Sequence, residues 1–260
     1  MRIAFFDSGL GGLTVLAEAL RQLPDEQYLY FADTLHVPYG PKPHDEVKRY
    51  IRASMEQVMK EEVKAVVIAC NTATSLAIAE LRQHYDIPII GMEPAVKPAV
   101  EMNRASGKRV LVLATPITLR QSKYIALISR VDNAHIVDSL PLPELVQFCE
   151  ELCFDQATIR AYFEEKLSAF DLRAYGTLVL GCTHFPFYRE LLREFLPGHI
   201  QLVDGSKGTV NRLVEVLAAE RLLESGGQGE VRYQCSSGDE AYIARMKRAL
   251  AIYQNTMKQV

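Results

Sequence analysis

Residues 65–74 read AVVIACNTAT, and residues 177–186 read TLVLGCTHFP. Each stretch begins with a short apolar run, passes through one small residue to a cysteine, and continues into a threonine-containing turn. A continuous apolar run of this length followed by a polar turn is typical of a buried parallel strand. The two stretches lie too far apart for a short tandem repeat. They therefore predict two similar α/β halves, each with a cysteine, Cys70 or Cys182, at the carboxyl end of a strand.

Short apolar runs alternate with helical patterns along the whole chain. The predicted strands lie at residues 3–6, 28–31, 65–69, 88–90, 110–114, 135–137, 177–180 and 200–203. Helices are predicted between them, for example at residues 46–60, 74–84 and 143–152. This alternation is the pattern of βαβ units around a parallel sheet. The sequence thus predicts an α/β protein of two similar α/β lobes with mainly parallel sheets and an active site in the cleft between them.

The boundary between the lobes is predicted near EPAVKP at residues 93–98. The first lobe is expected to comprise residues 1–95 together with 208–260, and the second lobe residues 96–207. The tail contains GEVRYQCSSGDEAYIARM, which reads as a strand followed by a helix. We expect this tail to return to the first lobe, because it would otherwise form a small isolated layer.

The composition is that of an ordinary globular protein. Of the 260 residues, 48% are hydrophobic and 23% are charged, and the net charge is -3. This charge gives no electrostatic reason to expect nucleic acid or anionic lipid as a partner. No apolar run approaches the ~20 residues that span a bilayer, and MRIAFFDSG leads directly into a strand without the features of a signal peptide. The sequence predicts a cytoplasmic protein.

The five cysteines, at positions 70, 149, 153, 182 and 235, do not resemble a disulfide framework, because their number is odd and they are widely spread. Cys149 and Cys153 form a CxxxC without a second pair to complete a zinc site, which favours two thiols one helical turn apart. The GLGG at residues 9–12 is not the GxGxxG of a dinucleotide site. We therefore expect neither a metal nor a cofactor.

Polar side chains cluster where the predicted strands end. In open α/β sheets, ligands bind outside the carboxyl ends of the strands. The residues that this sequence places there carry hydroxyls, amides, thiols and acids, or form tight turns. They are Asp7, Ser8, Asp33, Tyr39, Gly40, Cys70, Asn71, Thr72 and Thr74 in the first lobe, and Thr115, Thr118, Cys182, Thr183 and His184 in the second.

Several of these residues have a plainer interpretation, which the sequence leaves open. Asp7, Asn71, Thr72 and Thr183 are of types that also cap helices. Tyr39 can be a packed aromatic of its loop. The GLGG turn can hold an anion on the free N–H groups of the following helix, or it can be a common strand-to-helix turn.

The two strand-end cysteines, Cys70 and Cys182, are less easily explained by packing. One cysteine after a strand is normally inert core, but two, each followed by a predicted helix N-terminus, favour reactivity because that position lowers a thiol pKa. His184 is placed to tune or relay the proton of Cys182, and Asp7 that of Cys70. Two thiols that form neither a disulfide nor a metal pair suit the reversal of a stereocentre. One removes the α-proton from one face while the other delivers a proton to the opposite face.

The chain resembles the glutamate racemases from residue 3 to about residue 245. The residues that carry the resemblance are DSGLGG at 7–12, AD at 32–33, PYG at 38–40, CNTAT at 70–74, GMEP at 91–94, Thr115, Thr118 and Ser122, and GCTHFP at 181–186. The combination of CNTAT and GCTHFP at this separation is highly specific.

The resemblance implies a cofactor-independent enzyme that interconverts L- and D-glutamate. Cys70 would be the base for D-glutamate and Cys182 the base for L-glutamate, assisted by Asp7 and His184 respectively. The residues implied to contact the substrate are Asp7, Ser8, Tyr39, Gly40, Cys70, Asn71, Thr72, Thr74, Thr115, Thr118, Thr183 and His184.

The resemblance also implies supporting roles for two further acids, Asp33 and Glu150. The role of Glu150 is open, because it rests on LVQFCE at 145–150, in which Cys149 departs from the family pattern. A homodimer is implied as well, with D-glutamate supplied to peptidoglycan synthesis.

Three other functions remain as alternatives. An aspartate racemase would share the two-cysteine scheme, although that group resembles this chain less at DSGLGG and PYG, and one methylene in a pocket is worth only ~1–3 kcal/mol. A metal-binding or thiol–disulfide protein could use Cys182 and His184, but lacks an evident third ligand or a CxxC. A binding module of the periplasmic-receptor type would leave the twin cysteines unexplained.

Overall fold

The structure is a computed structural model that describes residues 1–92 and 94–257. The chain divides into two compact units. Unit 1 consists of Met1–Glu93 and Ser206–Val260, and unit 2 of Pro94–Gly205. The chain therefore crosses between units two residues earlier, at each crossing, than the positions 95/96 and 207/208 expected from the sequence.

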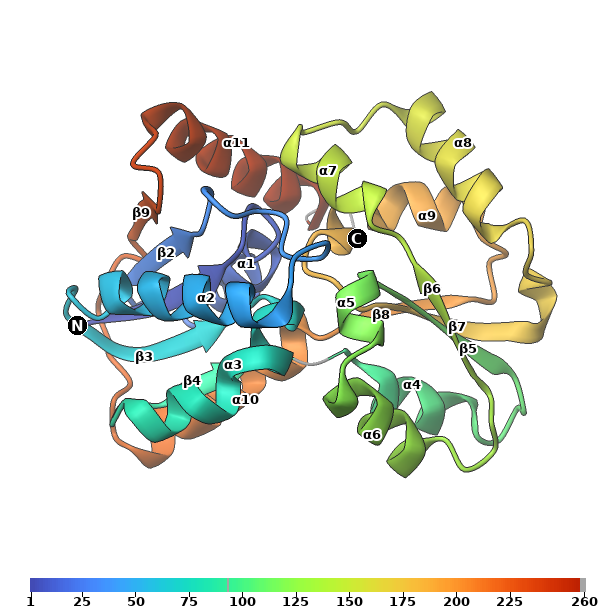
Figure 1. Cartoon of the computed structure of the whole chain (residues 1–260), viewed down its shortest axis with the longest axis horizontal. Helices are drawn as coiled ribbons and strands as arrows, with labels where there is room; N and C mark the ends of the chain where they lie inside the picture. Colours follow the sequence, from blue (N-terminus) through green and yellow to red (C-terminus); the bar gives the residue numbers. More distant parts are fainter. Residues whose placement is uncertain (93, 258–260) are drawn as a thin grey trace. The chain divides into compact units, whose positions relative to one another are not determined.

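Unit 1 contains a five-stranded sheet whose neighbouring strands are all parallel (Figure 1). Its strands are β1 (Arg2–Asp7), β2 (Tyr28–Ala32), β3 (Val63–Ile68), β4 (Ile89–Gly91) and β9 (Val231–Cys235), in the spatial order β4-β3-β1-β2-β9. Strand β9 belongs to the tail and pairs with β2. The tail thus completes the sheet of unit 1.

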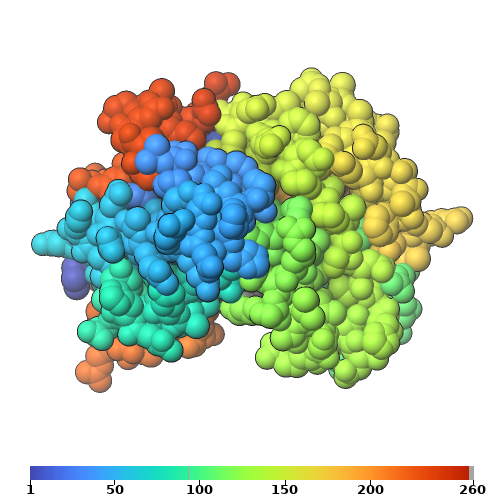
Figure 2. All heavy atoms as spheres, viewed as in Figure 1, coloured from blue at the N-terminus to red at the C-terminus, as the bar shows by residue number. Residues whose placement is uncertain are grey.

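Helices cover both faces of this sheet. They are α1 (Leu13–Gln22), α2 (His44–Val58), α3 (Asn71–His84), α10 (Ser206–Ala219) and α11 (Glu240–Met257). Helix α1 packs against α10 and α11, while α2 packs against α3 on the other face. In Figure 2, α2, α3 and the segment between β2 and α2 lie at the front of unit 1, and part of the C-terminal tail is visible above them in red. Beneath α2 and α3, side chains such as Phe6, Phe31 and Val66 form a buried apolar core.

Unit 2 contains a four-stranded parallel sheet, made of β5 (Arg109–Ala114), β6 (Val137–Pro141), β7 (Tyr175–Leu180) and β8 (Gln201–Asp204) in the order β6-β5-β7-β8. Its helical segments are α4 (Val96–Asn103), α5 (Pro116–Leu119), α6 (Ser122–Val131), α7 (Glu144–Glu150), α8 (Gln156–Leu167), the 3-10 turns η1 (Leu172–Ala174) and η2 (Phe185–Tyr188), and α9 (Arg189–Phe195). Helix α4 packs against α6, and α8 packs against α9.

The strand predicted at 135–137 is wrong in position, since β6 begins at Val137 and runs to Pro141. His135 has a positive φ of 52° and cannot continue a strand. The Asp132 carboxylate accepts hydrogen bonds from the backbone N–H groups of Ile136 and Val137, at 2.9 and 3.0 Å. The turn therefore includes Ile136, whose apolar side chain had suggested a strand residue. The polar DSLP that follows is tolerated because β6 is an edge strand.

No helix in the part of the chain that the structure describes combines the length and the apolar character needed to cross a membrane.

Candidate active site

Each sheet has one point at which the direction of winding reverses. In unit 1, β2 lies on one side of β1 and β3 lies on the other, so the switch point is between β1 and β3. In unit 2, β6 and β7 flank β5 in the same way, so the switch point is between β5 and β7. Ligands of open α/β sheets bind at such points, beyond the carboxyl ends of the strands. Cys70 follows β3 and Cys182 follows β7, so each thiol lies at the switch point of its own unit.

Cys70 forms the N-cap of α3. Its Sγ accepts a hydrogen bond from the backbone N–H of Ala73 at 3.4 Å, and its backbone is extended. The helix predicted to begin at residue 74 therefore begins three residues earlier, directly after the thiol. The positive end of a 14-residue helix at this position favours the thiolate form. Cys70 is 6% exposed, and its Sγ lies 3.9 Å from the Ser8 hydroxyl.

The register between β1 and β3 brings Asp7 to the same rim. Phe6 pairs with Ile68, and the N–H of Ala69 donates to the carbonyl of Phe6 at 2.9 Å. Asp7 and Ser8 continue from β1, and Ala69 and Cys70 continue from β3. The register therefore brings these two pairs of residues side by side. The Asp7 carboxylate is fully buried and accepts a hydrogen bond from the N–H of Gly9 at 3.0 Å, so it also shapes the turn that follows β1.

The first turn of α3 carries three predicted substrate ligands. Asn71, Thr72 and Thr74 are all buried. The Asn71 Oδ1 atom has no hydrogen-bond partner among the described residues, which is unusual for a buried polar atom and leaves it able to accept from a ligand. The Thr74 hydroxyl already donates to the carbonyl of Ile68 at 3.0 Å and accepts from the N–H of Met92 at 3.1 Å. Thr74 therefore serves at least to tie α3 to the strand ends.

Asp33 and Tyr39 form a buried pair after β2. The Tyr39 hydroxyl donates to Asp33 Oδ2 at 2.6 Å, and both residues are buried. Burial raises the pKa of the Tyr39 phenol, and the nearby negative groups Asp33, Cys70 and Asp7 raise it further. The phenol therefore stays protonated and acts as a hydrogen-bonding group. Gly40, which follows it, is half-buried.

Two residues beside Asp33 were not among those predicted from the sequence. The His36 ring nitrogen Nδ1 lies 2.8 and 3.0 Å from the two carboxylate oxygens of Asp33, and the His36 ring stacks on Tyr50 of α2. The local signal that could have identified His36 is its position, three residues after a strand-end acid. Tyr50 gave no signal, because it lies on a helix and reaches the site only through packing.

In unit 2, the register between β5 and β7 brings Thr115 to the side of Cys182. Leu113 pairs with Leu180, and the N–H of Gly181 donates to the carbonyl of Leu113 at 2.7 Å. A Cβ at Gly181 would lie 2.8 Å from that carbonyl oxygen, so this close pairing requires glycine. Cys182 is 8% exposed.

The threonines of unit 2 are buried around this point. The Thr115 and Thr118 hydroxyls lie 2.9 Å apart, and Thr115 caps the short helix α5 by accepting from the N–H of Thr118. Thr183, directly after the thiol, is buried as well. Thr115 and Thr118 therefore follow β5, and Cys182 and Thr183 follow β7.

His184 links Cys182 to Glu150. His184 Nδ1 lies 3.7 Å from Cys182 Sγ, and His184 Nε2 lies 2.7 Å from Glu150 Oε1 at the end of α7. Burial alone lowers the pKa of His184, but the hydrogen bonds and charges of Cys182 and Glu150 outweigh it, and the pKa lies well above its ordinary value. The imidazole therefore holds a proton beside the Cys182 sulfur.

Both thiols follow a strand, but the predicted helix N-terminus directly after each of them is found only at Cys70. Cys182 leads into η2, a four-residue 3-10 turn with His184 at its N-cap, and not into an α-helix. Pro186 lies in the first turn of η2, a position at which proline is tolerated. Cys70 thus lies at a helix N-terminus, whereas Cys182 lies beside a protonated histidine.

None of the five cysteines forms a disulfide, and Cys149 and Cys235 are buried like the two thiols described above. Across residues 1–92 and 94–257, no group of three His, Cys, Asp or Glu side chains is arranged to hold a metal ion.

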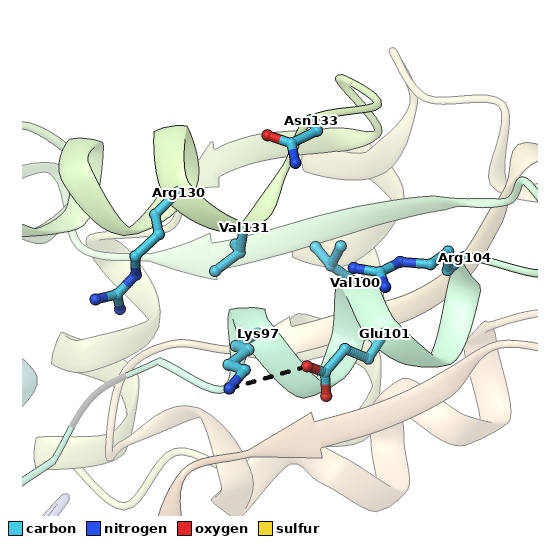
Figure 3. Close-up of a pocket in the computed structure, with 7 residues that line it drawn as sticks. All are labelled: Lys97, Val100, Glu101, Arg104, Arg130, Val131 and Asn133. Atoms are coloured by element: carbon cyan, nitrogen blue, oxygen red, sulfur yellow. Dashed lines mark ion pairs between the residues drawn. The ribbon is translucent and has the colours of Figure 1, made fainter.

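A surface hollow in unit 2 is also separate from the thiol. It has a volume of about 450 Å³ and lies between α4 and the end of α6 (Figure 3). Its lining residues are Lys97, Val100, Glu101, Arg104, Arg130, Val131 and Asn133. None of them is a predicted site residue, and the Lys97 ammonium is 4.0 Å from the Glu101 carboxylate.

The fold and the paired strand-end thiols agree with the family that comparison identifies. The family model Asp/Glu/Hydantoin racemase matches residues 8–213. The chain belongs to this family, and it is accordingly an isomerase of the racemase class.

Within the family, the chain is similar to glutamate racemases over its whole length. It is 48% identical to the glutamate racemase of Halothermothrix orenii, with 100% of both chains covered. It is 45% identical to glutamate racemase 2 of Bacillus subtilis, covering 99% of this chain and 98% of the relative. The crystal structure of glutamate racemase from Francisella tularensis in complex with D-glutamate is similar with a TM-score of 0.82 and 28% identity, over 96% of this chain and 93% of that one. The predicted α/β class with two parallel sheets is thereby confirmed.

Proposed function

We propose that this chain is a glutamate racemase that uses Cys70 and Cys182 as its two proton-transfer groups. The observation that carries the proposal is that each unit places one buried thiol at its own topological switch point. The choice of glutamate is supported by the relatives, since the curated racemases at 45% and 48% identity are both called glutamate racemases.

In the proposed reaction, the Cys182 thiolate removes the α-proton of L-glutamate, and the Cys70 thiol gives its proton to the opposite face of the resulting carbanion. Cys182 then carries a proton and Cys70 is a thiolate, which is the state that acts on D-glutamate. The reverse reaction, or proton exchange with solvent, restores the first state. Each thiol thus needs a neighbour that stabilises its charged form.

The surroundings of the thiols support this division. The N-terminus of α3 can stabilise the Cys70 thiolate, and protonated His184 can stabilise the Cys182 thiolate. We propose that Asp7 and His184 assist Cys70 and Cys182 respectively, and that Glu150 supports His184.

Substrate binding is proposed to use the polar groups at the same strand ends. The unpartnered Asn71 Oδ1 is suited to accept from the substrate ammonium group. Donors at the start of α3, together with buried hydroxyls such as those of Thr115 and Thr118, are suited to hold carboxylates and to stabilise the developing negative charge.

We further propose that the enzyme is a cytoplasmic homodimer whose D-glutamate is used in peptidoglycan synthesis. These three statements extend the resemblance to glutamate racemases. Mass in solution tests the dimer, the D-glutamate requirement of a deletion strain tests the use of the product, and cell fractionation tests the location.

The test of function is the optical rotation of L-glutamate and, separately, of L-aspartate incubated with purified protein. The protein is first dialysed against chelator and treated with hydroxylamine, which removes metals and aldehyde cofactors. We expect the rotation of glutamate to fall to zero and that of aspartate to persist, and the Cys235→Ala variant to behave like the unchanged protein. Faster racemisation of aspartate, or activity only after a cofactor is added back, would contradict the proposal.

A further inference from the structure

The loop between β2 and α2 is anchored on one fully buried carboxylate. Asp33 has no exposed surface, and a buried charge is stable only when hydrogen-bonding partners surround it. One of its oxygens accepts from the Tyr39 hydroxyl at 2.6 Å. His36 Nδ1 lies 2.8 Å from the other oxygen and 3.0 Å from the first. The side chains of His36 and Tyr39 therefore converge on Asp33 from the same loop.

His36 is in turn held by α2. Its ring stacks on Tyr50 with 3.5 Å between ring centroids and an interplanar angle of 11°, and the Tyr50 hydroxyl donates to Glu46 one turn earlier on the helix. The His36 side chain is 29% exposed while Asp33 is not exposed at all. His36 thus stands between Asp33 and solvent, and it connects the end of β2 to a rigid helix.

The loop that these contacts hold is the one that carries Tyr39 and Gly40. The backbone N–H groups of His36 and Val37 also donate to the Asp33 carbonyl, at 3.2 and 3.1 Å, so the first turn of the loop wraps around Asp33. Tyr39 packs in the same apolar cluster as Cys70. A displacement of Asp33 would therefore move Tyr39 and Gly40 relative to the Cys70 thiol.

We propose that His36 is a positioning residue, which links Asp33 to Tyr50 of α2 and thereby fixes the Tyr39–Gly40 turn on the Cys70 side of the substrate site. The inference rests on the proposed function in one respect, namely that this turn contacts glutamate. It assigns His36 and Tyr50 to substrate affinity and not to proton transfer.

The test compares His36→Leu, which keeps the bulk and removes the donor, with His36→Gln, which keeps a donor. We expect His36→Leu to raise KM on the order of tenfold in both directions, with a much smaller change in kcat. His36→Gln should recover most of the affinity. The matched control is His84→Leu, because His84 is an exposed histidine of the same unit that contacts a tyrosine ring, Tyr85, outside the site.

We call the Asp33–His36–Tyr50 contacts the clamp. Two variants of Tyr50 test its helix side, and they can be used if His36→Leu folds poorly. Tyr50→Phe keeps the stacked ring and should bind glutamate nearly as well as the unchanged protein. Tyr50→Leu removes the ring and should raise KM. If His36 and Tyr50 had a purely structural role, the variants would have lower melting temperatures, and KM would not change separately from kcat.

A second measurement does not depend on racemisation. Brief alkylation with iodoacetamide, mapped by mass spectrometry, gives the rate of labelling at Cys70 with Cys182 as the internal reference. We expect His36→Leu to label several-fold faster at Cys70, because the turn beside it is loosened, and at an unchanged rate at Cys182. If the unchanged protein did not racemise glutamate, the proposed function would fail while this labelling would still test the clamp. Unchanged KM and unchanged Cys70 labelling in His36→Leu, or equal damage in the Leu and Gln variants, would overturn the inference.

Discussion

His184 Nε2 lies 2.7 Å from Glu150 Oε1, although the two residues are 34 positions apart in the chain. The contact joins the end of α7 to the turn after β7 and places a carboxylate behind the imidazole that faces Cys182. A carboxylate in this position favours the protonated imidazole, which presents a positive charge to the Cys182 sulfur. The relationship leads to a prediction for each of the two residues.

Glu150→Gln should lower the reactivity of Cys182. Loss of the charge lowers the pKa of His184, so less imidazolium remains to stabilise the thiolate. Alkylation of Cys182 should therefore slow, because the thiolate and not the thiol is the nucleophile. Labelling of Cys70 should not change. Glu151→Gln, which alters the exposed acid next in the chain, is the control, and an equal effect of both variants would disprove the link.

The raised pKa of His184 also predicts how stability depends on pH. A group whose pKa is higher in the folded than in the unfolded protein contributes stability that is fully present below its unfolded pKa of about 6.5. This contribution is lost as the pH rises through the folded pKa. The free energies of unfolding of the unchanged protein and of Glu150→Gln, measured with urea between pH 6 and pH 9, should therefore converge toward high pH. If the two free energies of unfolding differed by the same amount over this whole pH range, the prediction that His184 holds a proton would be wrong.

Isotope incorporation should separate the two thiols. With L-glutamate in D2O, early D-glutamate should carry deuterium at Cα, because the proton it gains comes from solvent by way of Cys70. The remaining L-glutamate should stay largely protiated. Cys70→Ala should stop net racemisation but leave slow exchange of L-glutamate through Cys182, and Cys182→Ala should exchange only D-glutamate. Early product that retains the α-proton of the substrate would require a single shared base.

Gly12→Ala should impair unit 1 near Asp7. A Cβ at Gly12 would lie 2.7 Å from the Asp7 Cβ and 3.0 Å from the Tyr30 hydroxyl oxygen. Neither neighbour can easily move, because Asp7 is fully buried and the Tyr30 hydroxyl donates to the carbonyl of Gly9. Overpacking of this kind costs about 1–3 kcal/mol, and displacement of Asp7 should lower kcat. Gly198→Ala, where a Cβ meets nothing within 4 Å, should leave kcat and the melting temperature unchanged. Equal behaviour of the two variants would refute the steric argument.

Lys64→Met should destabilise the attachment of the tail to unit 1. The Lys64 ammonium is buried, lies 2.6 Å from Glu26 Oε2, and donates to the Leu222 carbonyl and to Glu224 at 2.7 and 2.9 Å. Replacing it leaves the buried Glu26 without its counter-charge, and breaking such a pair costs about 3–5 kcal/mol. The midpoint of urea unfolding should fall accordingly.

The control for this prediction is a partly exposed ion pair of the same unit. Arg232 pairs with Glu61 at 2.8 Å, and the arginine side chain is half exposed. Arg232→Met should have a small effect, because solvent screens such a pair. The double variant Lys64→Met with Glu26→Leu should regain part of the lost stability. If the urea midpoint of Lys64→Met were as high as that of Arg232→Met, the buried Lys64–Glu26 pair would not contribute more than the exposed pair, and the prediction would be wrong.

The amino-acid sequence by itself determined the α/β class, most of the strands and the identity of the two strand-end thiols. This was possible because a parallel strand buried on both faces reads as a continuous apolar run, and because the polar residues after it must lie at one rim of the sheet. Cys70 and Cys182 were found from such local patterns alone. The position of β6 was misread because the Asp132 carboxylate accepts hydrogen bonds from the backbone N–H groups of Ile136 and Val137, so that the turn continues up to Ile136.

Only the tertiary structure decided which of these groups are neighbours. Strand register sets Asp7 beside Ala69 and Cys70, and the packing of α7 brings Glu150 to His184. Stacking on α2 makes His36 a partner of Asp33. These contacts depend on hydrogen-bond ladders and helix packing between segments far apart in sequence, which no local pattern records. For the same reason the two similar sequences AVVIACNTAT and TLVLGCTHFP support their thiols differently, one by a helix N-terminus and the other by a histidine held on a carboxylate.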